Sequence, residues 1–164
     1  MILSLNEIET ACYRAALGAG LCHGLAEDAS AIAARLVTAR DDGLAIMLRA
    51  LIFADRHRVA APVFVCEDGA WRPRTGFLPS LMAGPAAADL RRAWPGARID
   101  VGMADEPAVI AACLEPGHLA RPAAAFTVAG QLWQDLTRLA ARTYVPASEK
   151  SRRLGAGAGL HDND

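Results

Sequence analysis

The strongest constraint on the fold is a helical repeat of apolar residues across most of the first 57 positions. Ser4 followed three residues later by Glu7 is a capping box, which predicts that a helix begins at residue 5. Gly18 and Gly20 predict the end of that helix. One face of it carries apolar residues at spacings of three and four: Leu5, Ile8, Cys12 and Ala15 or Ala16.

Two more helices are expected, over residues 25–39 and 44–57. Glu27 and Asp28 lie in the first turn of the earlier one and Arg35 and Arg40 near its end, as the helix dipole favours. The later helix is apolar around most of its circumference, so we expect it to be central. Three consecutive helices with short connections predict an antiparallel helical cluster.

After Pro62 the pattern changes to short strands and helices. Residues 63–66 and 70–72 predict a hairpin around the turn Glu67-Asp68-Gly69. The other expected elements are a helix from Pro85, at its first position, to about Trp94, a strand at 97–103, a short helix capped by Asp105, a strand at 123–130 and a last helix at 131–144.

The order of these elements predicts an α+β fold, with an N-terminal three-helix cluster followed by a small mixed sheet with short helices. A chain of 164 residues is expected to form one domain. We divide it into a helical part at about 1–60, a mixed α/β part at about 61–145 and a Gly-rich C-terminal segment at 146–164.

Charge and hydropathy exclude several classes of protein. The formal net charge of −1 lacks the positive field of a nucleic-acid-binding protein. No apolar run approaches the roughly 18 residues needed to span a bilayer, and the N-terminus lacks the features of a secretory signal. We therefore expect a cytoplasmic protein without nucleic-acid or membrane partners. Its four scattered cysteines are expected to stay reduced and to be small buried hydrophobic residues.

The familiar catalytic motifs are absent from the sequence. It contains no G-x-x-x-x-G-K-[ST], no G-x-S-x-G, no H-E-x-x-H and no C-x-x-C pair. The run "GAGAGL" follows no predicted strand and opens no predicted helix, so it is no dinucleotide-binding fingerprint. These observations assign neither a cofactor nor a metal site, and they leave open whether the protein is an enzyme.

The C-terminal segment has the densest group of candidate site residues. Its glycines would let the backbone approach an anion closely, and its two arginines would supply forked donors for a carboxylate or phosphate. The ligand-binding candidates are Ser148, Glu149, Arg152, Arg153, Gly155, Gly157 and Gly159. His161 and Asp162 are secondary candidates. A flexible polar tail is the alternative interpretation.

His23 is a further secondary candidate, because it follows Cys22 and a cationic neighbour can activate a thiolate. Both residues lie between two predicted helices, where adjacency in sequence does not make two side chains face each other. His23 could equally cap a helix or pack against one. His57, near a predicted helix C-terminus, already has a structural explanation there.

Two blocks of sequence resemble a bacterial family known as a domain of unknown function, number 3726. One is "LSLNEIE…AALGAGL…GLAEDA" at 3–29, and the other is "TYVPASEKSRRLGAGAGLHDND" at 143–164. The resemblance implies a free-standing protein in which the C-terminal glycine run is a family feature. It also implies that an aromatic residue usually stands where this chain has His23, which disfavours a catalytic histidine.

Two functions are compatible with the sequence. The first is an enzyme or accessory subunit of small-molecule metabolism that binds an anionic metabolite, suggested by Arg152 and Arg153 beside the glycine run. The alternative is a non-catalytic structural or interaction protein whose C-terminal segment mediates packing or assembly. A homo-oligomer or a complex with a partner subunit would then be expected.

Overall fold

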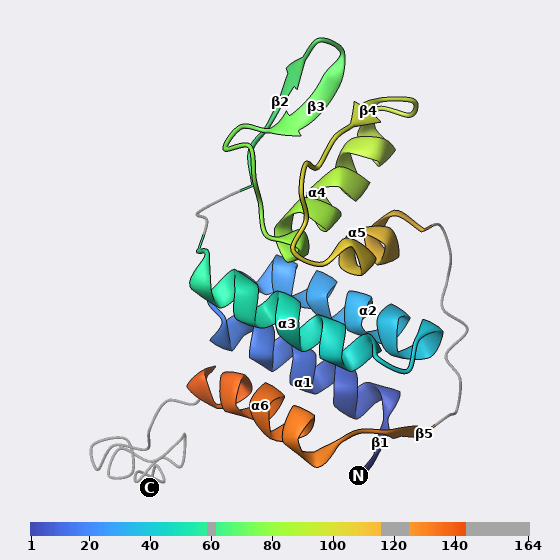
Figure 1. Ribbon diagram of the computed structural model, residues 1–164, viewed down its shortest axis with the longest axis vertical. Coiled ribbons are helices and arrows are strands. Elements are labelled where there is room, and N and C mark those ends of the chain that lie inside the picture. The colour runs from blue at the N-terminus through green and yellow to red at the C-terminus, as the bar shows by residue number, and fades with distance from the viewer. Residues whose placement is uncertain (59–61, 116–124, 144–164) are drawn as a thin grey trace, which may run out of the picture.

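The computed structural model describes residues 1–58, 62–115 and 125–143. These residues form six α-helices, two small sheets and a final 3-10 turn, which confirms the predicted α+β class (Figure 1). The helices are α1 Leu5–Gly18, α2 His23–Ala39, α3 Gly43–Arg56, α4 Ser80–Ala93, α5 Pro107–Leu114 and α6 Gly130–Ala140. The strands are β1 Ile2–Ser4, β2 Phe64–Glu67, β3 Ala70–Pro73, β4 Arg98–Ile99 and β5 Ala125–Thr127.

The three N-terminal helices form as the sequence predicts. The Glu7 amide donates to Ser4 Oγ at 3.3 Å, and the Ser4 amide donates to Glu7 Oε2 at 2.8 Å, so both halves of the capping box are present. Helix α3 is central, since the fully buried Met47 and Leu51 lie on it. Helix α2 begins two residues earlier than expected, at His23.

Helix α6 completes the helical layer, although it lies far away in sequence. It packs along α1, and its residues Leu136 and Leu139 join the same apolar core as Ile8 (Figure 1). The approach of the two helices is very close at Gly18, where an added Cβ would lie 1.9 Å from the Leu139 carbonyl oxygen. The helical layer is therefore built from both ends of the described chain.

The strands form two separate sheets, where the sequence predicted one. Strand β1 pairs antiparallel with β5, and Leu3 lies opposite Phe126. Strands β2, β3 and β4 form a three-stranded sheet in which β2–β3 is an antiparallel hairpin and β3–β4 is parallel. The predicted hairpin turn is confirmed, with φ of 50° at Asp68 and 73° at Gly69. Strand β1 escaped prediction because three residues cannot show an alternating pattern.

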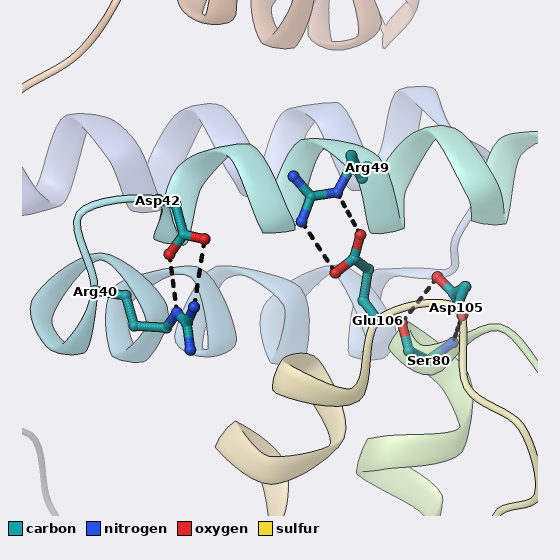
Figure 2. A network of polar contacts seen from close by, with 6 residues as sticks. All are labelled: Arg40, Asp42, Arg49, Ser80, Asp105 and Glu106. Atoms are coloured by element: carbon teal, nitrogen blue, oxygen red, sulfur yellow. Dashed lines mark hydrogen bonds and ion pairs between the residues drawn. The ribbon is translucent and has the colours of Figure 1, made fainter.

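Helix α4 does not begin at Pro85 as predicted. It begins at Ser80, and Pro85 lies inside it. The early start is stabilised from a distant position, because the Ser80 amide donates to Asp105 Oδ1 at 2.7 Å and Ser80 Oγ donates to Asp105 Oδ2 at 3.1 Å (Figure 2). The predicted role of Asp105 as the cap of the next helix is therefore wrong; Glu106 occupies the N-cap position of α5.

The neighbouring Glu106 ties α5 to the helical layer. Its carboxylate accepts two bonds from Arg49 on α3, with Nε–Oε1 and Nη2–Oε2 distances of 2.5 and 3.2 Å (Figure 2). Adjacent acidic residues thus hold both α4 and α5. The pair of helices is placed against α2 and α3, and this placement creates the cleft described below (Figure 1). Over the described ranges, no helix has the length and apolar character needed to cross a membrane.

Candidate functional site

A cleft with a volume of about 480 Å³ lies where helices α2, α4 and α5 meet. We call it the α2–α4–α5 cleft. Its walls combine charged side chains from all three elements with small or aliphatic ones. The lining residues are Asp28, Ala31, Ile32, Arg35, Pro85, Ala88, Asp89, Arg91, Arg92, Ala112, Cys113, Leu114 and Glu115.

Arg35 links α2 to the end of α5. Its Nη1 donates to the carbonyl oxygens of Ala112 and Glu115, at 2.8 and 2.9 Å. The last carbonyls of a helix have no partner within the helix, and that end attracts positive charge. The guanidinium thus satisfies two of these acceptors and fixes one side of the cleft.

Gly84 brings α4 close to α5 on another side. A Cβ at Gly84 would lie 2.5 Å from Cys113 Sγ and 3.2 Å from its Cβ. Cys113 can therefore pack directly on the α4 backbone. A larger residue at position 84 would separate the helices and change the shape of the cleft.

Two carboxylates face each other across the cleft, Asp28 on α2 and Asp89 on α4. Asp89 forms an ion pair with Arg92, one turn further along α4. The Asp28 carboxyl lies at the exposed rim, yet the surrounding atoms remove enough water to raise its pKa above the ordinary 3.8. The Asp89 carboxylate raises the pKa further and Arg92 opposes it. A cation in the cleft would therefore stabilise the ionised form of Asp28.

We expect the Asp28→Asn variant to be more stable than the parent protein at neutral pH and to lose this advantage in acid. A carboxyl with a higher pKa in the folded state destabilises that state once ionised, so stability falls as the pH rises through 3.8 and the higher native pKa. Urea unfolding across this pH range measures the difference. Glu27→Gln, which removes the preceding carboxylate outside the cleft, is the control for net charge. A stability difference that does not change with pH would contradict the interpretation.

Cys113 is not an activated nucleophile. Burial raises the pKa of its thiol to about 12, and the Asp28 carboxylate adds to this while Arg35 opposes it. A thiol must ionise to attack an electrophile, so Cys113 is unreactive at neutral pH. The chemistry available in the cleft is therefore that of charged and hydrogen-bonding groups.

The expectation that all four cysteines are buried is wrong for Cys22 and Cys66, which are exposed. Alkylation with iodoacetamide at neutral pH is therefore expected to modify these two first. Cys12 is buried, and burial raises its pKa to about 12, as at Cys113. Mass spectrometry of a time course measures the four rates separately. Modification of Cys113 at the rate of Cys66 would show that the cleft opens far more than the structure indicates.

Another hollow, of about 510 Å³, is less suited to a ligand. It is lined by the consecutive residues 37–42, at the end of α2 and the turn to α3. Arg40 and Asp42 there already bind each other, with Nε and Oδ1 2.9 Å apart (Figure 2). The lining of this hollow comes from one continuous run, whereas the side chains of the α2–α4–α5 cleft converge from three helices.

Residues 3–69 match the family described as protein of unknown function, DUF3726. The resemblance predicted from the N-terminal block is confirmed over this range. No curated protein and no solved structure matches the chain.

The DUF3726 match covers only one wall of the cleft. It includes α1, α2 and α3, and with them Asp28 and Arg35, and it ends at the hairpin turn. Asp89, Arg91 and Cys113 lie beyond it. The family match therefore covers the three N-terminal helices and leaves the opposite wall of the cleft outside it.

Most of the predicted site lies outside the described residues. This holds for Ser148, Glu149, Arg152, Arg153, Gly155, Gly157, Gly159, His161 and Asp162. His23 is described, and it is exposed at the first position of α2, where its Nδ1 lies 2.8 Å from the Tyr13 hydroxyl. It does not line the α2–α4–α5 cleft. Within the described ranges, no group of three or more His, Cys, Asp and Glu side chains could hold a metal ion.

Sequence reasoning missed the α2–α4–α5 cleft. From the sequence, Asp28 and Arg35 are explained by the helix dipole. Helix α2 as it forms has no acidic residue in its first turn and no basic residue in its last turn, so the dipole does not account for them. Asp89 and Arg92 form an ordinary pair three positions apart on α4. One available signal was the seven-residue interval from Asp28 to Arg35, which places both on one face of α2.

Proposed function

We propose that this protein binds a small polar metabolite in the α2–α4–α5 cleft and holds an anionic group of that metabolite with the cleft arginines. The observation that supports this most is the convergence of charged side chains from three helices around about 480 Å³. This volume lies within the range of roughly 300–1,000 Å³ typical of small-molecule sites, which combine an apolar lining with a few polar groups.

Arg91 is the first candidate for contact with the anionic group. It lies in the last turn of α4, is exposed, and makes no hydrogen bond or ion pair within the part of the chain that the structure describes. A guanidinium offers forked donors that match a carboxylate or phosphate. If the protein catalyses a reaction on the metabolite, Asp28 is the group best placed to exchange a proton.

Titration of the isotope-labelled protein with succinate, acetate and inorganic phosphate, followed by amide chemical shifts, tests the proposal. We expect amide shifts to change on α2, α4 and α5. We expect Arg91→Gln to lower the affinity for these anions about tenfold, a loss comparable to one charge-assisted hydrogen bond. Arg56→Gln is the matched control, because Arg56 is also an exposed arginine in the last turn of its helix. Shifts confined to other surfaces would contradict the proposal.

The predicted anion site at Arg152 and Arg153 stays a separate proposal. Deleting residues 155–164 together with Arg152→Gln and Arg153→Gln distinguishes the two, because the cleft residues are all retained while both arginines of the C-terminal site are removed. Unchanged anion binding in this variant places the site in the cleft. Loss of binding with an intact cleft supports the C-terminal site.

An interaction protein is the second candidate function, favoured by exposed apolar side chains. Trp94 is 52% exposed and stacks on Trp71 of the hairpin, with 5.1 Å between ring centroids, and Met103 is 83% exposed. Single exposed apolar residues are common, whereas adjacent ones that form a patch mark contact surfaces, and the stacked Trp71 and Trp94 are adjacent. Light scattering of the parent protein and of Trp94→Ser measures assembly; a homo-oligomer that uses this surface would dissociate in the variant.

A further inference from the structure

We infer that the ligand of the α2–α4–α5 cleft is a zwitterion, with a cationic amino group as well as the anionic group. This inference rests on the proposed function and specifies its ligand class. The charges of the cleft are balanced: three carboxylates, from Asp28, Asp89 and Glu115, stand against three guanidinium groups, from Arg35, Arg91 and Arg92. A simple anion or a simple cation would meet as many repulsive charges as attractive ones.

The pairing within the cleft leaves groups of both signs for a ligand. Asp89 and Arg92 bind each other, and Arg35 donates to the carbonyls at the end of α5. Within the described ranges, Asp28 and Arg91 make no hydrogen bond or ion pair, and neither does the carboxylate of Glu115. The unpaired groups are thus a guanidinium on α4 and carboxylates on α2 and at the end of α5.

The remaining lining suits the hydrocarbon part of such a molecule. It is built from small or aliphatic side chains, Ala31, Ile32, Pro85, Ala88, Ala112 and Leu114. These side chains can contact methylene groups but offer no hydrogen bonds. An ω-amino acid, with a carboxylate and an ammonium group separated by a short alkyl chain, combines all three features.

The protonation of Asp28 gives the inference an independent observable. The groups that face it are Asp89 and Arg92 from α4, Cys113 from α5 and Glu27 from its own helix. A ligand ammonium beside Asp28 would favour its ionised form and lower its pKa. At a pH near the Asp28 pKa, binding of a zwitterion should therefore release more protons than binding of the matched carboxylate, which can release only the proton of its own carboxyl group.

The test compares probes that differ only in their charged groups. A series of straight-chain ω-amino acids is titrated into the full chain beside the alkyl carboxylates and alkylamines of the same length. Affinity is measured by amide chemical shifts, and proton release by calorimetry in two buffers of different ionisation enthalpy. We expect one ω-amino acid to bind about tenfold more tightly than either matched single-charge probe, with proton release.

The variants assign each charge. Asp28→Asn should abolish both the additional proton release and the preference for the ω-amino acid over the alkyl carboxylate. Arg91→Gln should weaken the binding of both acids about tenfold. Glu27→Gln, outside the cleft, should retain the preference. Equal binding of the carboxylate and the ω-amino acid in the cleft would overturn the zwitterion but keep the proposed function. Probes that leave the cleft residues unperturbed would overturn both.

Discussion

Replacing Gly18 with alanine is expected to destabilise the protein by roughly 3 kcal/mol, at the upper end of the usual cost of overpacking. The new Cβ would lie 1.9 Å from the carbonyl oxygen of Leu139 and 2.8 Å from its carbonyl carbon. Both are backbone atoms of α6, so no side-chain rotation can relieve the clash. Helix α6 must move away from α1, and contacts around the buried Leu136 are lost with it.

Urea unfolding followed by circular dichroism measures this loss. Gly24→Ala is the matched control, because Gly24 also lies in a helix and a Cβ there meets nothing within 4 Å. We expect the control to be neutral or stabilising by up to about 1 kcal/mol, since alanine favours helix over glycine. Equal effects at the two positions would show that helix propensity, and not the contact with α6, decides the outcome.

Gly18 also shows which part of the fold can be predicted from the sequence. It marked the end of α1 correctly, because glycine is a local helix-terminating signal. Its contact with Leu139, 121 positions later, leaves no local trace. Helices α1, α2 and α3 follow from capping and periodicity within each segment, whereas the return of α6 to this layer depends on tertiary packing. The division into a helical part at 1–60 and a mixed part stays a prediction, and Leu136 of α6 lies in the same apolar core as Ile8 of α1.

Pro85 shows a different limit of the sequence, because a local signal for the start of a helix is overridden by a hydrogen bond from a distant residue. Proline is favoured at the first turn of a helix, which suggested that α4 begins there. The structure begins the helix at Ser80, whose amide is satisfied by Asp105. The cleft was missed for the same reason. Asp28, Asp89 and Cys113 come from three separate helices, and no spacing in the sequence reveals that they meet.

The Asp105→Ala variant is expected to lose about 2–3 kcal/mol of stability, from a lost helix cap together with unsatisfied buried donors. Ser80 is fully buried, and both its amide and its hydroxyl donate to the Asp105 carboxylate. Truncation leaves both donors without this acceptor. The start of α4 would loosen, and Pro85 provides no amide to reinforce the next turn. Thermal and urea unfolding measure the effect.

Asp105→Asn separates hydrogen bonding from charge. Its amide oxygen can accept from the Ser80 amide while its nitrogen donates to Ser80 Oγ, so we expect most of the lost stability to return. The same pair of variants tests how the cleft is built. Asp105 does not line it, but α4 carries Asp89 and Arg91, so Asp105→Ala should weaken ligand binding under folding conditions and Asp105→Asn should restore it. Equal losses in both variants would mean that the negative charge, and not the geometry of the cap, positions α4. Unchanged binding in Asp105→Ala would mean that the middle of α4 is held by its packing on α2 and α5 alone.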